Sequence, residues 1–297
     1  MMRSWLFVPA ANAAMLAKAH GRGADALIID LEDSVAEPAK PAARVNAAEF
    51  LRAHAGVRTP QLWVRINPLS TPHALMDLSA VVSARPDGIV LPKPDSAAHV
   101  AELGHYLAAL ESSAGLEIGA IRILPIATET PAAVFSLGTY ATPVHPRLAG
   151  LTWGAEDLPA ALGASINRTD TGQFTDICRL GRALCLAGAA AAGVPAIETV
   201  YPAFQDIDGL RAYAALGRRE GFAGMMAIHP AQVPIINAVF TPTETEVEHA
   251  RRVVALFAAN PGVGTIALDG KMVDAPHLKQ AQRLLEIFDT ASSFATR

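Results

Sequence analysis

Eight short apolar runs alternate with longer stretches of helical spacing along most of the chain. The apolar runs predict β-strands at Trp5–Pro9, Ala26–Asp30, Gln61–Asn67, Gly88–Pro92, Ile121–Thr128, Leu148–Gly154, Ala196–Tyr201 and Gly224–His229. Stretches rich in alanine and leucine lie between them and predict helices such as Ala13–Gly21, Pro41–Ala55, Ala97–Leu110, Asp176–Gly193 and Leu210–Gly221. Several of these predicted helices end at a glycine, as helices commonly do.

The composition of the strands indicates how the sheet is covered. Strands that are apolar almost without interruption are buried on both faces, which is typical of a parallel sheet wrapped in helices. Residues 4–230 hold eight strand and helix units, and their size is normal for a TIM (β/α)8 barrel. We therefore expect an α/β protein built on this barrel, with a doubly wound open sheet as the alternative.

The pattern changes after Pro230, where the strand and helix repeat stops. The predicted elements of this part are the helices Val233–Phe240 and Thr245–Ala259, a strand, turn and strand within 265–277, and the helix Leu278–Ala291. A break rich in glycine and proline at 261–264 separates the first two helices from the rest. We expect one domain at 1–260, formed by the barrel and a C-terminal helical extension. A small lid or arm module at 261–297 is expected to pack on a neighbouring subunit.

Composition and charge exclude several classes of protein. The chain has 297 residues, of which 51% are hydrophobic and 18% are charged, which is too apolar for a disordered polymer. Its formal net charge is −4 and no run of like charges is present, so neither nucleic acid nor an anionic membrane surface is an expected partner. An enzyme-sized globular domain remains.

The cysteine spacing and the apolar segments favour a cytoplasmic protein. Cys178 and Cys185 lie seven residues apart in a predicted helix, about 10 Å along its axis and beyond disulfide reach. We expect free thiols in a reducing compartment. The longest stretch of small apolar residues, 183–197, is shorter than the roughly 20 residues that span a bilayer. Pro9 and Asn12 interrupt the apolar N-terminus, which disfavours a secretion signal.

Polar and charged residues collect where the predicted strands end. They are Asp30, Glu32 and Asp33 after the second strand, Arg65 on the third, Lys93 after the fourth, Glu129 after the fifth, Glu156 and Asp157 after the sixth, Glu198 on the seventh and His229 on the eighth. In a TIM barrel the carboxyl ends of the strands form the active-site face. The pattern therefore predicts an active site at this mouth.

Glu129 and Asp157 follow strands that are neighbours in the predicted barrel. Two carboxylates about 5 Å apart repel each other unless a cation or a proton lies between them. Oxygen ligands without nearby cysteine or histidine favour Mg²⁺, or Mn²⁺ in its place, which commonly takes one or two carboxylates together with water and substrate. The alternative interpretation is that Glu129 and Asp157 cap the helices that begin directly after them.

The other charged residues also have two interpretations. Arg65 could hold a carboxylate or an enolate oxygen at the mouth, or form an internal ion pair with Glu32 or Asp33. Glu32 and Asp33 are expected to hold metal-bound water, since side chains that alternate in direction cannot all be ligands. Lys93 lies between two prolines and is expected to be a surface or structural lysine rather than a Schiff-base lysine. His229 is expected to satisfy backbone groups at the rim.

Taken together, these motifs resemble the citrate lyase beta subunit-like group of the HpcH/HpaI aldolase/citrate lyase superfamily over essentially the whole chain. The stretches that carry the resemblance are Arg3–Pro9, Asp30–Val35, Val64–Asn67, Leu91–Lys93, Glu129–Thr130, Gly154–Asp157, Ile228–Pro230 and Asp269–Asp274. The resemblance implies a TIM-barrel carbon–carbon lyase that acts on a 3-hydroxy-carboxyacyl thioester of coenzyme A. It also implies that Glu129 and Asp157 hold Mg²⁺ and bind the substrate through it.

Two features narrow the class within this superfamily. The free-pyruvate aldolases use a histidine base after the second strand, where this chain has Asp30-Leu31-Glu32-Asp33. This difference disfavours the free-pyruvate aldolases. The chain keeps Asp274 in the segment that carries the acid/base aspartate of malyl-CoA and citramalyl-CoA lyases, where it reaches the active site of a neighbouring subunit. By the same resemblance Arg65 stabilises the enolate oxygen and Glu32 assists catalysis. The substrate-binding residues at the thioester carrier are then Arg3, Phe7 and Lys18, with a plain surface lysine as the alternative for Lys18.

The expected function is a Mg²⁺-dependent lyase that cleaves malyl-CoA or citramalyl-CoA into a 2-oxo acid and an acyl-CoA, or forms the thioester by Claisen condensation. One alternative is a citrate lyase beta subunit that works in a complex on a thioester of acyl-carrier protein. Another is a barrel without catalysis that serves as an assembly partner. An arm that serves a neighbour requires a homo-oligomer, and the resemblance implies a trimer or a hexamer.

Overall fold

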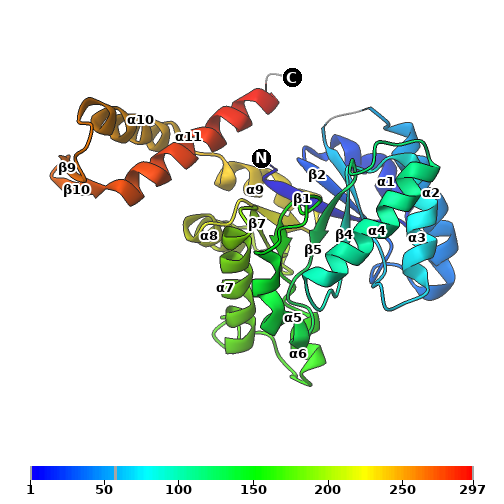
Figure 1. The fold of residues 1–297 in the computed structure, drawn as a ribbon. Coiled ribbons are helices and arrows are strands. Elements are labelled where there is room, and N and C mark those ends of the chain that lie inside the picture. The colour runs from blue at the N-terminus through cyan, green and yellow to red at the C-terminus, as the bar shows by residue number, and fades with distance from the viewer. Residues whose placement is uncertain (1, 57–58, 296–297) are drawn as a thin grey trace. The chain divides into compact units, whose positions relative to one another are not determined.

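The computed structural model describes residues 2–56 and 59–295 and shows the predicted alternation of strands and helices (Figure 1). The strands are β1 Ser4–Pro9, β2 Ala26–Asp30, β3 Gln61–Arg65, β4 Gly88–Leu91, β5 Arg122–Pro125, β6 Leu151–Thr152, β7 Ala196–Glu198, β8 Gly224–Ala227, β9 Thr265–Leu268 and β10 Lys271–Asp274. The α-helices are α1 Ala13–Ala19, α2 Lys40–Ala53, α3 His73–Val81, α4 Ala97–Ser113, α5 Pro131–Ser136, α6 Asp157–Ala161, α7 Asp176–Ala191, α8 Ile207–Glu220, α9 Val233–Phe240, α10 Glu244–Ala259 and α11 Ala275–Ala295. Short 3-10 turns are η1 His20–Arg22, η2 Glu37–Ala39, η3 Val82–Ala84, η4 Leu137–Tyr140 and η5 Pro230–Gln232.

Strands β1 to β8 form one parallel sheet in the order β5-β4-β3-β2-β1-β8-β7-β6. The two outer strands of this order meet through parallel bridges from Ile123 to Leu148 and from Ile126 to Thr152. The N–H of Ala127 also donates to the Thr152 carbonyl at 2.7 Å. These contacts join the sheet edges into a barrel, so the predicted TIM barrel is confirmed and the open-sheet alternative is wrong.

Burial of both faces explains why the central strands are apolar almost without interruption. The four residues of β2 that precede Asp30, from Ala26 to Ile29, are each 0% exposed. On the neighbouring strands Gly88 faces the ring of Trp63, which would lie 2.2 Å from a β-carbon at that position. Glycine is therefore required there because the Trp63 ring lies over this position.

Capping residues fix where several helices begin and end. The Asp206 carboxylate accepts from the N–H of Gly209 at the start of α8, and Gly221 ends that helix in the left-handed conformation. The predicted strands run longer than the observed ones; β7 ends at Glu198 rather than at Tyr201. The residues beyond these strand ends leave the sheet and form the loops at the mouth of the barrel.

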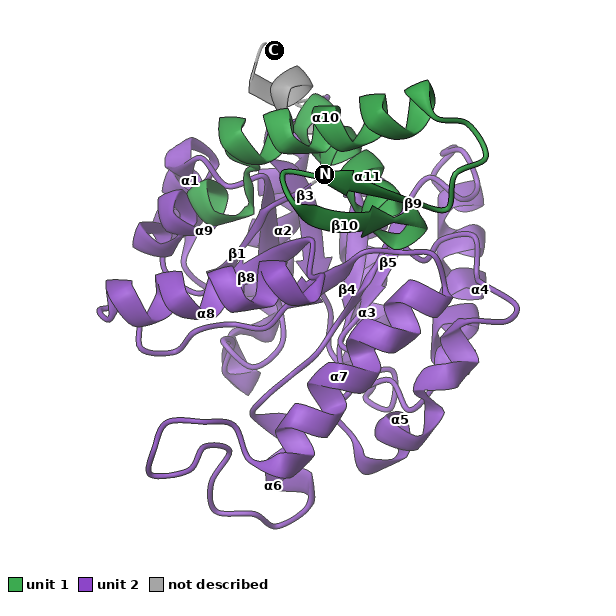
Figure 2. Ribbon diagram, turned by 90° about the vertical axis from the view of Figure 1, so that its left-hand side faces the viewer, with its two compact units in different colours: residues 1, 237–297 green, residues 2–236 purple. Residues whose placement is uncertain are grey.

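The chain divides into two compact units, residues 2–236 and residues 237 onward (Figure 2). The division lies within α9, earlier than the expected boundary at 260. It lies there because α10 packs on α11 and shares a small core with it. The side chains of this core are Ala250, Val253 and Ala281, with Val254, Phe257, Leu268, Leu284 and Leu285 against them.

The strand, turn and strand predicted in the second unit are the antiparallel pair β9 and β10. Asp269 and Gly270 join them, both with positive φ, as two-residue hairpin turns require. Asp269 also forms an ion pair with Arg252 of α10 at 2.6 Å, which ties the hairpin to the helix. Asp274 ends β10 directly before α11.

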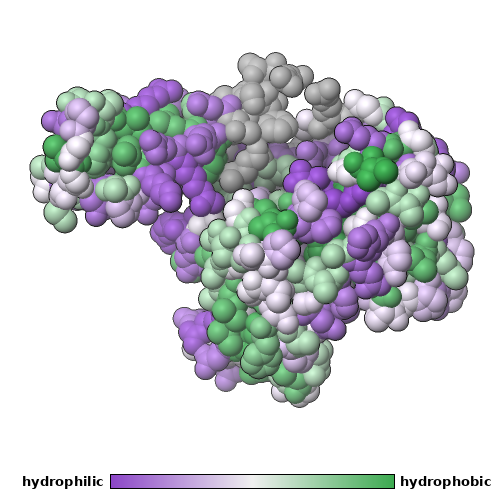
Figure 3. Space-filling model, viewed as in Figure 1, coloured by the Kyte–Doolittle hydropathy of each residue, from purple (hydrophilic) through white to green (hydrophobic). Residues whose placement is uncertain are grey.

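Cys178 and Cys185 are free and buried, as the sequence predicts. None of the helices in the described part of the chain is both long and apolar enough to span a bilayer. Apolar side chains are exposed around α5 and α6 (Figure 3), among them Phe135, which is 93% exposed, and Leu162 and Ile166.

Candidate active site

The register of the first three strands brings Asp30 and Arg65 together. Pro9 is paired with Asp30 across β1 and β2, and Asp30 is paired with Arg65 across β2 and β3. Neighbouring strands lie about 4.8 Å apart, so these side chains meet at the carboxyl ends of the strands. Arg65 donates from Nε and Nη2 to the two Asp30 oxygens at 2.6 and 2.7 Å.

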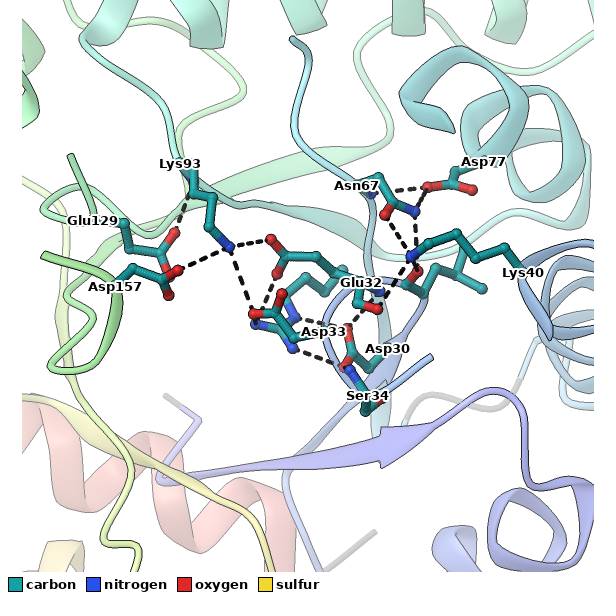
Figure 4. Close-up of polar contacts among 12 residues, drawn as sticks. Asp30, Glu32, Asp33, Ser34, Lys40, Asn67, Asp77, Lys93, Glu129 and Asp157 are labelled. Atoms are coloured by element: carbon teal, nitrogen blue, oxygen red, sulfur yellow. Dashed lines mark hydrogen bonds and ion pairs between the residues drawn. The ribbon is translucent and has the colours of Figure 1, made fainter. Parts of the chain in front are cut away.

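Arg65 is the centre of an ion-pair cluster at the mouth (Figure 4). Its Nη1 lies 2.9 Å from Glu32 Oε2 and 3.7 Å from Asp33 Oδ2, and its guanidinium carbon lies 4.9 Å from the centre of the Phe7 ring. Burial alone would lower the pKa of Arg65, but its bonds to Asp30 and the nearby negative charges raise it instead. Burial would raise the pKa of Asp30, yet the contacts with Arg65 lower it. Arg65 is therefore a fixed cation that is paired internally at the mouth.

The buried side chain of Lys40 holds the backbone of the loop that carries Glu32. Lys40 Nζ donates to the backbone carbonyls of Leu31 and Glu32 at 3.1 and 3.2 Å and to Asn67 Oδ1 at 2.7 Å. Asn67 in turn donates to Asp77 at 2.7 Å. These bonds hold the backbone of the loop, and the Glu32 carboxylate points toward Lys93 (Figure 4).

Lys93 is half-buried at the mouth, so of the two expectations for it, a surface or a structural lysine, the structural one fits its contacts. Its Nζ lies 2.5 Å from Glu32 Oε1, 3.1 Å from Asp157 Oδ1 and 3.5 Å from Asp33 Oδ2 (Figure 4). Burial would lower the pKa of Lys93, but the hydrogen bond to Glu32 and the charges of Glu129 and Asp157 raise it. Lys93 is therefore a second cation among the carboxylates.

Glu129 is only 4% exposed, and its Oε2 accepts a hydrogen bond from the backbone N–H of Lys93 at 2.7 Å. Burial raises the pKa of Glu129 well above its ordinary value, and the charges of Asp157 and Glu32 raise it further, against the effect of Lys93. The charge of Asp157 therefore acts on the Glu129 carboxyl group, and Lys93 contacts both side chains. Their repulsion makes the pair a place where added positive charge is stabilising.

The capping interpretation of these two carboxylates does not hold. Thr130 is the N-cap of α5, and its hydroxyl accepts from the N–H of Ala133 at 3.1 Å. Glu156 occupies the N-cap position of α6 without a side-chain hydrogen bond, and Asp157 is the first residue of that helix. Both carboxylates are therefore available for another role at the mouth.

The chemistry of this pair fits a magnesium ion. Within residues 2–56 and 59–295, no three His, Cys, Asp or Glu side chains converge as a metal-binding group. One or two carboxylates are a common protein contribution to Mg²⁺, which keeps several positions for water and substrate. Glu129 and Asp157 are thus the residues that would hold the ion.

The three residues expected at the thioester carrier lie in different places. Phe7 lies against Arg65 at the mouth. Arg3 precedes β1 and forms an ion pair with Asp25 at 2.8 Å, so it lies at the amino end of the strand, roughly 20 Å from the carboxyl end. The structure therefore does not bring Arg3 to the mouth. Lys18 is exposed on α1.

Asp274 is partly exposed in the second unit and is hydrogen-bonded to His277, with 2.5 Å between Oδ1 and the ring Nδ1. This bond lowers the pKa of Asp274 below its ordinary value.

His229 accepts from the N–H of Ala231 at 3.2 Å, which confirms its expected role toward the backbone. Glu198 is buried and accepts from Trp153 and Arg182, so its role is structural.

The sequence placed Asp30 and Lys93 at the mouth but did not predict their partners. Asp30 is the direct partner of Arg65, and the alignment of the strand ends could have indicated it. Lys93 follows a buried strand just as the other site residues do, but its φ of 51° is rare for lysine and could not be predicted.

Comparisons with known proteins show the family to which the chain is similar. The family model described as HpcH/HpaI aldolase/citrate lyase matches residues 3–230. Citrate lyase subunit beta of Haemophilus influenzae is 35% identical over 96% of this chain and 96% of its own length. (3S)-malyl-CoA thioesterase of Cereibacter sphaeroides is 36% identical over 98% of this chain and 96% of its own length.

Solved structures show the same fold. The CitE protein of Mycobacterium tuberculosis, in complex with magnesium, acetoacetate and coenzyme A, has a TM-score of 0.77 at 33% identity and covers 97% of this chain and 98% of that one. A complex of that protein with magnesium and pyruvate has a TM-score of 0.69 at 31% identity over 96% and 98% of the two chains. The chain therefore belongs to the HpcH/HpaI aldolase/citrate lyase family.

Proposed function

We propose that the protein is a Mg²⁺-dependent carbon–carbon lyase. Its substrate would be a 3-hydroxy-carboxyacyl-CoA such as malyl-CoA or citramalyl-CoA, cleaved into a 2-oxo acid and an acyl-CoA or formed from them by Claisen condensation. The observation that carries the proposal is that Lys93 contacts both Glu129 and Asp157, through its backbone N–H at 2.7 Å and its ammonium at 3.1 Å, beside the fixed cation Arg65. Relatives that bind magnesium, pyruvate and coenzyme A support it.

Glu129 and Asp157 would hold the divalent ion at the mouth. When bound there, Mg²⁺ supplies a Lewis acid for the carbonyl group of the 2-oxo acid. Lys93 fixes the position of Glu129 through its backbone N–H. Glu129 is almost fully buried. Water is therefore largely excluded around its carboxylate, and electrostatic interactions there are strong.

Arg65 would stabilise the negative charge that develops on the thioester oxygen. Asp30 holds the guanidinium on one side with two hydrogen bonds, and the Phe7 ring lies against it. A donor that is already oriented loses little freedom during the reaction, and removal of one such donor typically costs about 10²–10³ in turnover. Glu32 would assist by keeping Arg65 and Lys93 in place.

Asp274 would move the proton at the α-carbon of the acyl-CoA. In the condensing direction its carboxylate removes this proton, the resulting enolate carbon bonds to the carbonyl carbon of the 2-oxo acid, and the new alkoxide takes up a proton from water. In cleavage the hydroxyl group loses its proton to water, the carbon–carbon bond breaks, and Asp274 returns a proton to the enolate carbon. His277 holds one carboxylate oxygen and keeps the group ionised, as a base requires. The arm would reach a neighbouring subunit, so the active form would be a homo-oligomer, a trimer or a hexamer. Phe7 and Lys18 are proposed contacts of the coenzyme.

A substrate panel tests this proposal. Purified protein with Mg²⁺ is incubated with malyl-, methylmalyl-, citramalyl- and citryl-CoA, and both the 2-oxo acid and free thiol are measured. A lyase releases the 2-oxo acid and an acyl-CoA without free thiol. Free coenzyme A together with the hydroxy acid would instead show a thioesterase, the activity named for the Cereibacter sphaeroides relative. No turnover of any thioester would favour a role in assembly without catalysis.

A citrate lyase beta subunit is the second candidate, because the Haemophilus influenzae relative with that name matches over almost the full length. In that case the isolated chain would be inactive on coenzyme A esters. Activity would require citryl thioester on acyl-carrier protein. The same assay with both forms of the citryl thioester separates the two candidates.

A further inference from the structure

Lys93 touches both halves of the proposed cation site. Its backbone N–H donates to Glu129 at 2.7 Å, while its ammonium lies 3.1 Å from Asp157 Oδ1 (Figure 4). The same Nζ lies 2.5 Å from Glu32 and 3.5 Å from Asp33. The ammonium therefore has two sets of partners, the proposed metal ligand Asp157 on one side and the Glu32 loop on the other.

Lys93 has an unusual backbone conformation that directs its N–H and its side chain to different parts of the site. Its φ of 51° is in the left-handed region, which costs free energy for a residue with a side chain. This turn allows one residue to direct its N–H at Glu129 and its side chain into the mouth. The Glu32 end of the contact is also fixed, because Lys40 holds that loop through two backbone carbonyls.

A cation on Asp157 would have to share Oδ1 with this ammonium or take its place. A divalent ion and an ammonium a few ångströms apart repel each other, and the repulsion is only partly screened in a half-buried site. Glu32 Oε1 and Asp33 Oδ2 already lie close to Nζ, so the ammonium has partners when it leaves Asp157. The movement needs only a change of side-chain torsion angles.

We propose that the Lys93 ammonium competes with the divalent cation for Asp157 and so sets the metal affinity of the site, withdrawing to Glu32 and Asp33 when the cation binds. The inference rests on the proposed function, in which Glu129 and Asp157 hold the cation. It assigns to Lys93, which is not itself a metal ligand, a role in setting the affinity for the cation. Before the cation binds, the ammonium balances the negative charge of the carboxylates. Because the cation must displace it from Asp157, the affinity for the cation is lower than it would be without Lys93.

The test is the affinity for Mn²⁺ alone, measured from the free-ion signal in electron paramagnetic resonance. Lys93→Met removes the charge with nearly the same side-chain length, and we expect Mn²⁺ to bind about tenfold or more tightly, because a neighbouring positive charge is lost. Lys279→Met, the same change at an exposed position of α11, should leave the affinity unchanged. Unchanged or weaker binding by Lys93→Met would overturn the inference.

A charge-retaining variant separates competition from simple positioning. Lys93→Arg should bind Mn²⁺ about as the wild type does, whereas a role in shape alone would make Arg and Met similarly disruptive. If Lys93→Met does not fold, Lys93→Gln, which keeps a hydrogen-bond donor without the charge, takes its place with the same expected result. Thermal unfolding in Mn²⁺ gives a second readout, and the uncharged variant should gain more stability from the ion than the wild type does.

The same titration separates failure of this inference from failure of the proposed function. Glu129→Gln and Asp157→Asn should each abolish Mn²⁺ binding at the mouth. If they do and Lys93→Met does not tighten binding, only the competition is refuted. If both leave Mn²⁺ binding unchanged, the proposed metal site itself is wrong, and the inference falls with it.

Discussion

Substitution of Gly154 by alanine tests whether the position of the Glu129 side chain matters for the site, because it adds a β-carbon next to that side chain. This β-carbon would lie 2.8 Å from Glu129 Cγ and 3.0 Å from Glu129 Oε1. Carbon atoms in contact prefer about 3.5–4.0 Å, so the glutamate would have to retreat by roughly 1 Å. It cannot retreat freely, because the side chain is buried and Oε2 is bonded to the Lys93 N–H.

Gly154→Ala is therefore expected to displace a proposed metal ligand without changing any charge. Misplacement by about 1 Å can lower turnover by about 10², and overpacking costs about 1–3 kcal/mol of stability. We expect a loss of turnover of this size, weaker Mg²⁺ stabilisation and a lower Tm. Turnover of the active thioester and thermal unfolding with and without Mg²⁺ measure the three effects.

The chain offers a matched control for this variant. A β-carbon at Gly138 would meet no heavy atom within 4 Å, and this glycine does not have positive φ, so Gly138→Ala should leave all three quantities unchanged. A Gly154→Ala protein with lower Tm but normal turnover and Mg²⁺ response would show that the position of Glu129 does not matter for catalysis. That result would refute the reasoning about the site.

The remaining predictions concern the ion pair, the base and the arm. Asp30→Asn should lower the free energy of unfolding by about 3 kcal/mol at pH 7, because it removes the carboxylate that pairs with Nε and Nη2 of the buried Arg65. Since the pKa of Asp30 is lowered in the folded state, this difference should be present above about pH 4 and shrink as the pH falls below it, which denaturation at several pH values checks. Asp274→Asn should lower turnover by about 10² or more without changing Tm or Mg²⁺ stabilisation; full activity would exclude it as the base. A mixture of Glu129→Gln and Asp274→Asn chains, refolded together, should regain about one quarter of wild-type activity if the arm serves a neighbour, and none if it serves its own barrel.

The barrel could be predicted from the sequence because its signals are local. Apolar runs such as Ala26–Asp30 and the glycines that end helices appear directly in the chain, and β2 has the bounds that the pattern predicts. The ends of β6 and β7 were less predictable, since residues such as Tyr201 have strand-like composition but leave the sheet. Hydrogen bonding across the barrel, rather than local preference, decides where those strands stop.

The sequence predicted several members of the cluster at the mouth but not how they pair. The rule that chemistry lies at strand ends found Arg65, Glu129 and Asp157, while the partners of each depended on register and on loop conformation. Lys93 is the clearest example, because nothing in the sequence indicates a left-handed backbone there. That conformation, rather than the type of residue, places its ammonium between Glu32 and Asp157.

Anomalous diffraction from crystals grown with Mn²⁺ tests the central claim most directly. The account predicts an anomalous peak at the mouth of the barrel, with one carboxylate oxygen of Glu129 and one of Asp157 each about 2.1 Å from the ion. A peak bound elsewhere, with these two carboxylates in contact only with protein, would contradict it.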